Sequence, residues 1–291
     1  MELHQLRYFA TIVDEGSFTR AAETLFVAQP GVSAQVKRLE KEIGQPLLHR
    51  SRTGVTPTTA GKELLPHARA ALAAVESGRQ AVDALAGLTR GVIRLGTVPG
   101  LAPEPLDLAS LLAGFHRQFP DIDLQLIEAS AAELAGRVRT GRLDVAVLAT
   151  GPEPLEGLAL RPLIRDRIVA VWSGDHRPSL PETVELSELA GHDLLLLPVQ
   201  SGVRALLDDR FRQAGIVPKV RFEAGDPRFL VSLAHRGFGV ALVPESYAAG
   251  LPYAPVTPDI VGETALAWSD RVPISPATTA LVRWTLEQLR A

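Results

Sequence analysis

The chain has 291 residues, 46% of them hydrophobic and 22% charged, with a formal net charge of −3. This composition excludes a disordered chain and is typical of a globular protein with about two domains. Because the sequence contains no cysteine, it excludes a disulfide framework, a thiolate zinc site, an iron–sulfur cluster and a cysteine nucleophile. The first residues lack a signal-peptide pattern, and no uninterrupted apolar run approaches the ~18 residues of a membrane span. We therefore expect a cytoplasmic protein without a membrane partner.

The charge is unevenly distributed along the chain. Residues 1–62 contain eight basic and six acidic residues, a net +2, which leaves 22 basic and 27 acidic residues, a net −5, for the remainder. A basic segment attached to an acidic body is typical of a protein whose basic part meets an anion such as DNA. A solvated helix face gives the same bias, so charge alone leaves both interpretations open.

The N-terminal part of the chain predicts three short helices and a β-hairpin. Apolar residues recur at helical spacing from Leu3 to Val13, and Ser17 is a suitable N-cap for a second helix over 18–25. Gln29-Pro30 opens a third helix, where proline in the first turn costs no hydrogen bond. A hairpin is predicted over 47–57. Helix, tight turn, helix and hairpin together indicate a winged helix-turn-helix, with the hairpin as the wing.

The third helix has two distinct faces. Its buried stripe is predicted to consist of Val32, Val36 and Leu39, spaced three and four residues apart. At about 100° per residue, the opposite face carries small and basic residues. This exposed face contains Pro30, Ala34, Lys37, Arg38 and Lys41, with Ser33 at its flank.

A long helix is predicted from Thr58 to about Leu88. Small and apolar residues alternate at spacings of three and four, which makes a heptad seam. The seam consists of Gly61, Leu64, Ala68, Ala71, Val75, Gly78, Val82 and Leu85. We expect it to pair with a second copy of the chain, because no neighbouring segment has a matching seam. A helical hairpin within the monomer is the alternative.

Beyond residue 90 strand-like and helix-like runs alternate, which favours an α/β body with mainly parallel strands. The predicted strands are Val92–Leu95, Ile122–Ile127, Val145–Leu148, Ile168–Trp172, Leu194–Leu197, Val220–Phe222, Val240–Val243 and Ala265–Trp268, and the predicted helices are Leu106–Phe119, Ala131–Thr140, Val203–Ala214, Arg228–Arg236 and Thr278–Leu289.

Dense motifs at the N-terminus resemble those of LysR-type transcriptional regulators. They are Glu15-Gly16-Ser17-Phe18-Thr19-Arg20-Ala21-Ala22, Val27-Ala28-Gln29-Pro30, Val32-Ser33 and Gly44-Gln45-Pro46-Leu47. Looser matches continue in the body, at Phe119-Pro120, Leu143-Asp144-Val145-Ala146, and Gly237-Phe238-Gly239-Val240-Ala241-Leu242-Val243-Pro244. The resemblance covers essentially the whole chain.

The resemblance implies a domain organisation. A winged helix-turn-helix DNA-binding domain would span 1–58, a linker helix that dimerises 59–90, and a two-lobed periplasmic-binding-protein-like effector domain 91–291. Lobe one would comprise 91–161 and 262–291, and lobe two, inserted into it, 162–261. The chain would cross between the lobes near 161–162 and 261–262.

The DNA-binding residues follow from the same motif. The N-terminal residues of a recognition helix usually reach base edges, which points to Gln29, Pro30, Ser33 and Ala34. Phosphate contacts supply affinity rather than sequence preference, and for these we expect Lys37, Arg38, Arg50 and Arg52. Without the motif, the alternative interpretation is that Gln29-Pro30 only caps a helix and that the four cations form a solvated basic face.

The effector residues are implied by the places where family members bind ligands: the ends of the first two strands of lobe one and the first strand–helix turn of lobe two. Amides and hydroxyls at helix N-termini suit a carboxylate or another small anion, so an anionic effector is favoured. The alternative role for the hydroxyl residues is helix capping. The predicted residues are Thr97, Gly100, Ser130, Gln200, Ser201 and Gly202.

Enzyme signatures are weak. The seven histidines are scattered, without the close spacing of a metal site, and no G-x-S-x-G elbow is present. Gly237-x-Gly239 lacks the third glycine of a dinucleotide fingerprint and follows a predicted helix rather than a strand. We therefore expect no catalytic residue, metal or cofactor.

The prediction is a sequence-specific DNA-binding transcriptional regulator, a homodimer or homotetramer that acts on double-stranded DNA and is modulated by a small molecule between the lobes. One alternative is a ligand-binding or transport protein with the same two-lobed fold, which the N-terminal motif disfavours. The other is a small-molecule enzyme, for which the sequence offers no catalytic constellation.

Overall fold

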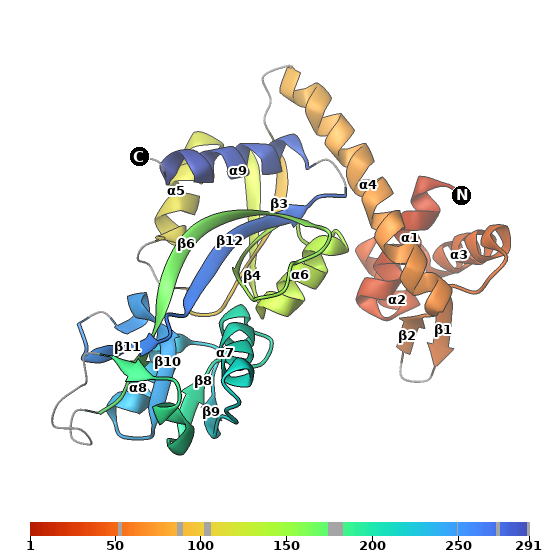
Figure 1. Cartoon of the computed structure of the whole chain (residues 1–291). Coiled ribbons are helices and arrows are strands. Elements are labelled where there is room, and N and C mark those ends of the chain that lie inside the picture. The colour runs from red at the N-terminus through yellow and green to blue at the C-terminus, as the bar shows by residue number, and fades with distance from the viewer. Residues whose placement is uncertain are drawn as a thin grey trace. The chain divides into compact units, whose positions relative to one another are not determined.

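The computed structural model describes residues 1–51, 54–85, 90–101, 106–173, 183–248, 250–271 and 274–289 (Figure 1). The predicted phosphate contact Arg52 and the last part of the predicted linker, residues 86–89, lie outside the described residues. The chain forms two compact units. The first holds the N-terminal residues together with the turn Arg139–Arg142, and the second holds most of the chain from Arg90 onward.

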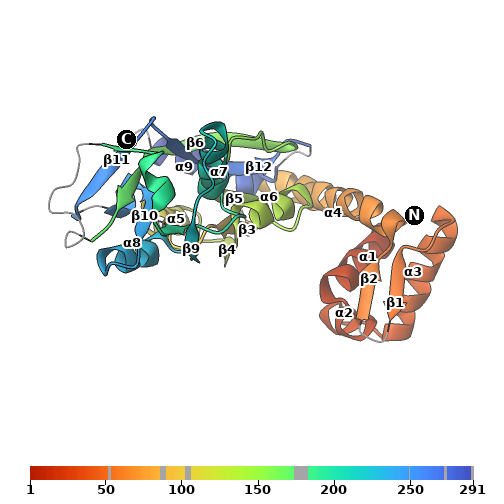
Figure 2. The same cartoon turned by 60° about the horizontal axis from the view of Figure 1, so that its bottom comes forward.

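The first unit begins with the predicted winged helix-turn-helix, which is confirmed (Figure 2). Its elements are α1 (Leu3–Glu15), α2 (Phe18–Thr24), α3 (Gln29–Ile43), β1 (Leu48–Ser51) and β2 (Gly54–Pro57). The backbone ends α1 at Gly16, whose φ of 61° is left-handed and favours glycine. The Ser17 side chain accepts a hydrogen bond from the Arg20 amide and so caps α2 as expected.

A shared core holds these short elements together. Phe9 and Ile12 of α1 and Val32, Val36 and Leu39 of α3 are fully buried. Burial of side chains of this size stabilises the fold by about 1.5–3 kcal/mol each. The predicted buried stripe of the third helix is therefore confirmed, and it turns the opposite face of α3 outward.

The long helix α4 (Thr59–Leu85) divides its predicted seam between two environments. Gly61 packs directly on the chain before the hairpin, since a Cβ there would lie 2.1 Å from the Leu47 carbonyl oxygen. Ala68 is buried in the core of the helix-turn-helix domain. Farther along, Val75 is 53% and Val82 67% exposed. The first half of the seam is thus used within its own chain, and only the second half is free for a partner.

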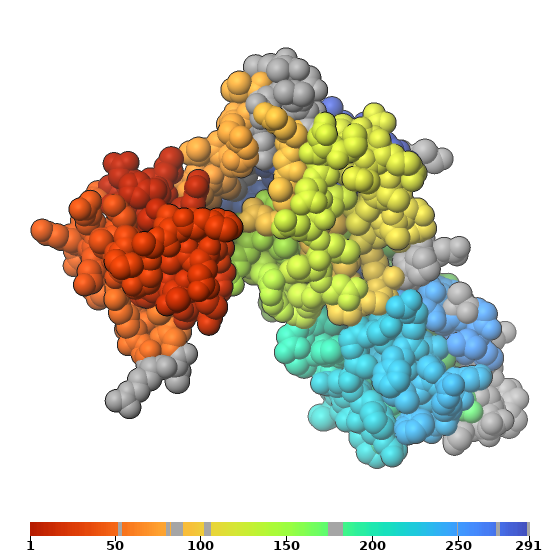
Figure 3. Space-filling view, turned by 180° about the vertical axis from the view of Figure 1, so that it is seen from behind, coloured from red at the N-terminus to blue at the C-terminus, as the bar shows by residue number. Residues whose placement is uncertain are grey.

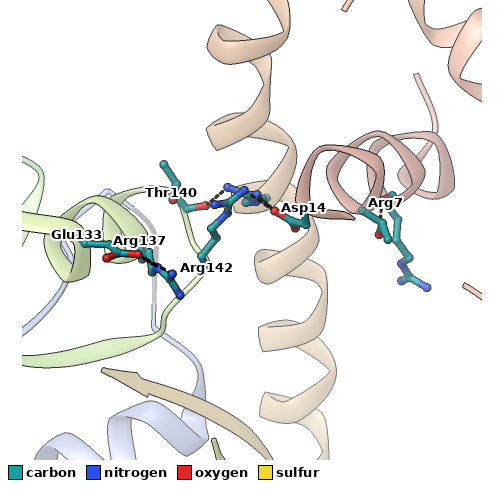
Figure 4. A network of polar contacts seen from close by, with 8 residues as sticks. Arg7, Asp14, Glu133, Arg137, Thr140 and Arg142 are labelled. Carbon is teal, nitrogen blue, oxygen red and sulfur yellow. Dashed lines mark hydrogen bonds and ion pairs between the residues drawn. The ribbon is translucent and has the colours of Figure 1, made fainter. Parts of the chain in front are cut away.

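A polar network joins α1, α4 and the turn Arg139–Arg142 (Figure 4). The Asp14 carboxylate accepts hydrogen bonds from Arg69, which is buried, and from Arg142 at 2.6 Å. Arg69 also donates to the Thr140 carbonyl at 3.5 Å. Asp14 therefore compensates two guanidinium groups, one of which has little access to water.

The second unit is the predicted two-lobed α/β domain, which is also confirmed. Lobe one is built on the parallel strands β3 (Gly91–Thr97), β4 (Ile122–Glu128) and β5 (Val145–Thr150). Its helices are α5 (Leu108–Gln118), α6 (Ala131–Arg139) and α9 (Pro276–Gln288). Trp284 of α9 donates its indole N–H to the Leu111 carbonyl of α5 at 3.2 Å, which fixes these two helices against each other.

Two long antiparallel strands connect the lobes, β6 (Leu158–Val171) and β12 (Val261–Ser269), and they run side by side in Figure 1. From Leu158 to Arg167 β6 pairs with β12, and from Ile168 to Val171 it pairs with β10. The strand β6 therefore changes its partner between Arg167 and Ile168. The pattern 168–172 had predicted only the second, fully buried part of this strand.

Lobe two contains the parallel strands β8 (Leu194–Leu196), β9 (Val220–Glu223) and β10 (Val240–Pro244), with helices α7 (Gly202–Gln213) and α8 (Pro227–His235). Its smaller elements are β7 (Val184–Glu185), β11 (Tyr253–Thr257) and the 3₁₀ turns η2 (Glu188–Gly191) and η3 (Glu245–Ala248).

One mixed sheet runs through both lobes, in the order β4-β3-β5-β12-β6-β10-β8-β9. The expectation of mainly parallel strands holds within each lobe, but β6 and β12 pair antiparallel with their neighbours. In Figure 3 the yellow and green surface of lobe one lies beside the cyan and blue surface of lobe two. Among the described helices, none is long and apolar enough to cross a membrane.

Candidate DNA-binding surface and effector cleft

The start of α3 presents polar side chains that the helix does not need for its own capping. Ala28 occupies the N-cap position and makes no side-chain hydrogen bond, and Pro30 lies in the first turn. Gln29 and Ser33 are half-buried, whereas Pro30 and Ala34 are exposed. Gln29 and Ser33 make no hydrogen bond to any other side chain in the part of the chain that is described, so their polar atoms are available to a partner.

The next turns of α3 carry exposed cations. Lys37 and Arg38 project from the face opposite the buried Val36 and Leu39, and neither forms an ion pair with another described residue. An unpaired exposed cation keeps its full attraction for a phosphate, because no neighbouring carboxylate has to be displaced first.

The hairpin supplies a further cation. Arg50 of β1 is exposed, and its guanidinium carbon lies 4.3 Å from the centre of the Phe18 ring of α2. This stacking orients the guanidinium without neutralising its charge. The Val55 amide of β2 donates to the Gly16 carbonyl at 2.9 Å, which ties the hairpin to the end of α1.

The structure also draws attention to Phe26, which the sequence interpretation treated only as part of a turn. Phe26 lies between α2 and α3, is 96% exposed, and has a φ of 56°. A bulky side chain rarely adopts this left-handed conformation, and strained residues concentrate at functional sites. Its sequence neighbours Leu25, Val27 and Ala28 are also apolar, so the sequence did not distinguish Phe26 from a buried residue.

The second site is a cavity of about 180 Å³ between the lobes. Residues of β5, α6, β6, α7, α8, β10, η3 and β12, together with the segment that follows β3, surround it. Its walls are mostly apolar, among them Val98, Pro99, Leu101, Ile164, Leu197, Pro198, Val203, Pro227, Pro244 and Tyr247.

Three of the six predicted effector residues line this cavity: Ser130 before α6, and Gln200 and Ser201 before α7. The Gln200 carbonyl accepts a hydrogen bond from the Ala132 amide at 3.3 Å. This bond joins the two lobes along one side of the cavity and occupies an amide at the start of α6.

The other three predicted effector residues lie behind the lining. Thr97 is 4% exposed, and its hydroxyl has no hydrogen-bond partner in the described parts of the chain. A Cβ at Gly100, whose φ is 66°, would lie 2.5 Å from the Asp226 carboxylate. A Cβ at Gly202 would lie 2.1 Å from the Ala149 carbonyl oxygen. Both glycines therefore permit close packing beneath the cavity.

The charged groups in the lining are carboxylates. Asp166 of β6 and Glu263 of β12 belong to it, and no Lys, Arg or His does among the described residues. Arg228 follows the lining residue Pro227, but both hydrogen bonds of its side chain go to Asp226, at 3.1 Å each. These hydrogen bonds raise the pKa of Arg228 above its ordinary value.

Sequence interpretation missed Asp166, which lies in the part of β6 that was not predicted as a strand. Ile164 is followed by three charged residues, Arg165-Asp166-Arg167, so the segment lacks the apolar and polar alternation of a half-buried strand and offered no clear signal. Over the described residues, no group of three His, Asp or Glu side chains is placed to hold a metal ion.

Comparison with known proteins identifies the families of both parts of the chain. Residues 3–62 match the family model of the bacterial regulatory helix-turn-helix protein, lysR family, and residues 86–290 match the LysR substrate binding domain. The nitrogen assimilation regulatory protein nac of Klebsiella aerogenes is 34% identical over 288 residues, which cover 97% of this chain and 93% of that protein.

Solved structures agree as well. A full-length OxyR variant from Pseudomonas aeruginosa is 25% identical with a TM-score of 0.77, and the match covers 100% of this chain and 95% of that one. Full-length CbnR in complex with its target DNA shares the fold, with 22% identity, a TM-score of 0.53, and coverage of 99% and 100%. The two family models span nearly the whole chain, which therefore belongs to the LysR family of transcriptional regulators and is an effector-modulated DNA-binding regulator rather than an enzyme.

Proposed function

We propose that this regulator binds double-stranded DNA in the cytoplasm through α3 and the β1–β2 hairpin. Base edges would be contacted from the start of α3, by Gln29, Pro30, Ser33 and Ala34. Phosphates would be bound by Lys37, Arg38, Arg50 and Arg52. The observation that carries this proposal is the row of exposed, unpaired cations on the face of α3 opposite its buried stripe.

The regulator would act as a homodimer or homotetramer. The exposed second half of the α4 seam, at Val75 and Val82, supports pairing between two copies of the chain. Two copies related by a two-fold axis would present two recognition helices to a dyad-symmetric site, which doubles the number of phosphate contacts. The domain limits proposed for this organisation are those implied by the family resemblance: 1–58, 59–90 and 91–291.

The effector would occupy the cavity between the lobes. Ser130, Gln200 and Ser201 would contact it, and Thr97, Gly100 and Gly202 would support these contacts from behind. An anionic effector was expected from the helix N-termini, but the described lining contains no cation to bind one. An effector that contacts both lobes stabilises one arrangement of them, and a coupling of typically ~1–3 kcal/mol is enough to change the affinity for DNA.

The test is the salt dependence of binding to a specific duplex. If a dimer uses four cations per protomer, a plot of the logarithm of the association constant against the logarithm of the salt concentration has a slope of about −7, at ~0.9 per phosphate contact. Arg38→Ala removes two contacts per dimer and makes the slope less steep by about two units, with sequence preference unchanged. Fluorescence anisotropy at several salt concentrations measures both quantities.

Arg117→Ala is a matched control, since Arg117 lies in α5 of the effector domain and outside the proposed surface. Binding that does not depend on salt, or an equal change in both variants, contradicts the proposal. A protein that binds small ligands but no duplex would instead be the ligand-binding protein considered as an alternative.

A further inference from the structure

The cations beside the cavity are already bonded to carboxylates. Four arginines either adjoin a lining residue in sequence or flank one on β6, and each forms an ion pair within 3.3 Å: Arg165 with Glu263, Arg167 with Glu245, Arg204 with Asp208, and Arg228 with Asp226. Arg204 is additionally paired with Glu223. None of the four lines the cavity, and none is left to neutralise a ligand.

Asp166 is in the opposite situation. It lines the cavity and has no cation within ion-pair distance anywhere in the described chain. Its Oδ2 accepts a hydrogen bond from the Ser246 amide at 3.1 Å, which holds the carboxylate in place, and Oδ1 has no donor among the described residues. The carboxylate is therefore oriented by the backbone but not compensated in charge.

The pairing of β6 with β12 explains why Asp166 faces the ligand and its neighbours do not. In an antiparallel pair, directly opposite residues share one face of the sheet, and successive residues alternate between faces. Asp166 lies opposite Gly262, and Ile164 lies opposite Thr264, and all four line the cavity. Arg165 lies opposite Glu263 and forms an ion pair with it at 3.2 Å, so the Glu263 carboxylate already has a counterion although Glu263 belongs to the lining.

The second carboxylate of the lining is thus compensated, and one uncompensated negative charge remains in a mostly apolar cavity. An anion would meet repulsion there with no cation to offset it, because charges interact strongly where water is scarce. A protonated amine would gain a charge-assisted hydrogen bond from Oδ1. Gly262, which has no side chain, adds no side-chain atoms opposite this carboxylate.

We infer that the effector is a small cationic molecule, an apolar body carrying a protonated amine that binds Asp166. This inference rests on the proposed function in one respect, namely that the cavity between the lobes is the effector site. The volume of about 180 Å³ limits the size of the body. An apolar cavity of about 150 Å³ accommodates benzene, so a ring or a short chain with one amine fits this one.

The experiment uses the full-length protein and two matched sets of probes. Phenethylamine, phenethyl alcohol and hydrocinnamate share a ring, and pentylamine, pentanol and hexanoate share a chain, so each set varies the charge on a nearly constant body. Alkyl amines are protonated at neutral pH, since their pKa resembles that of lysine. Isothermal titration calorimetry and the ligand-induced rise in Tm measure binding without DNA.

We expect the amines to bind best in both sets. Asp166→Asn is expected to weaken amine binding by about tenfold to a hundredfold, the effect of losing one charge-assisted hydrogen bond. Asp166→Glu keeps the charge and restores part of the affinity. Asp123→Asn removes the same charge at an exposed position of β4 outside the cavity lining and serves as the matched control, with amine affinity changed less than threefold.

Three results overturn the inference: tighter binding of the carboxylates, no preference for amines over alcohols, or equal losses in Asp166→Asn and Asp123→Asn. The Tm of each unliganded variant shows whether it is folded. If Asp166→Asn does not fold, Asp166→Glu still tests the contribution of this carboxylate to amine binding. Duplex binding by the same preparations separates the two claims. Normal DNA binding without amine preference refutes only the ligand class, whereas absent DNA binding refutes the proposed function.

Discussion

The two recognition surfaces of this chain arrange their charges in opposite ways. On α3 the cations Lys37 and Arg38 are exposed and unpaired in the described structure. Around the cavity between the lobes the neighbouring arginines are all paired, and the carboxylate of Asp166 is the charge left without a counterion. Each surface therefore lacks the charge that its proposed partner brings: negative phosphates for the helix, and a positive amine for the cavity.

They also differ in how they are assembled. The DNA-binding surface comes from one helix and the hairpin that follows it, whereas the cavity is lined by segments from residue 98 to residue 264. A convex surface can be formed by consecutive residues. A cavity that excludes water must be enclosed from several sides, and only distant parts of the chain can provide that.

The largest effect is expected for Val75→Glu in α4. This variant tests whether DNA binding requires a dimer and whether the cavity binds its ligand in a single chain. A glutamate at each copy of this position would place like charges across an apolar contact, and an unpaired charge at a dry contact costs about 3–5 kcal/mol. We expect dimers to dissociate and the salt slope for DNA to halve, with amine binding unchanged. Light scattering measures the oligomer, and Ser77→Glu, off the seam, is the control. An unchanged oligomer would place the pairing surface elsewhere.

The next effect concerns sequence preference. Gln29→Ala and Ser33→Ala each remove a base contact, which costs about 1–3 kcal/mol per site in specific binding. Neither side chain is fully buried, so Tm is expected to change little. Competition between a specific and a random duplex is the measurement, with non-specific binding preserved. A strong drop in Tm with preserved preference would make that residue structural and move base recognition to Lys37, Arg38 or the hairpin.

A smaller effect is expected behind the cavity. The Thr97 hydroxyl is buried without a partner, and such a group costs about 1–3 kcal/mol of stability. Thr97→Val removes it at similar volume, so the unliganded protein is expected to gain about 1 kcal/mol in unfolding free energy. Chemical denaturation measures this gain. Destabilisation would mean that the hydroxyl has a partner in solution. The Thr150 hydroxyl donates to the Glu263 carbonyl at 3.3 Å, so Thr150→Val measures the stability lost with one such hydrogen bond.

The smallest effect is expected in the turn before α3. Phe26 holds a left-handed backbone that costs a bulky L-residue roughly 1–2 kcal/mol, and asparagine tolerates it better. Phe26→Asn is therefore expected to stabilise the protein by about 0.5–1 kcal/mol, seen as a rise in Tm. If the exposed ring also contacts DNA, the same variant binds the duplex more weakly. Lower stability would show that the ring makes a contact in the folded protein that offsets the strain.

The sequence by itself determined the N-terminal domain. Local signals were sufficient there, because Ser17, Gln29-Pro30 and the stripe Val32, Val36 and Leu39 act within one or two turns of helix. They placed the helices, the hairpin and the exposed face of α3 before any distant contact was known. The order of strands and helices in the body was also predicted, since buried strands of parallel sheets are continuous apolar runs.

Tertiary structure decided the rest. Residues 158–167 of β6 carry arginines and an aspartate on half-exposed faces, so they do not resemble a buried strand until β12 is seen beside them. In α4 one heptad pattern serves two purposes: Gly61 packs on Leu47, and Val75 remains exposed. Asp166 is a candidate ligand-binding residue only because the neighbouring Arg165 and Arg167 are paired with Glu263 and Glu245 instead. Periodicity identifies which side of a helix or strand is apolar, but the partner that covers it, and the charges left uncompensated, depend on contacts between residues far apart in the chain.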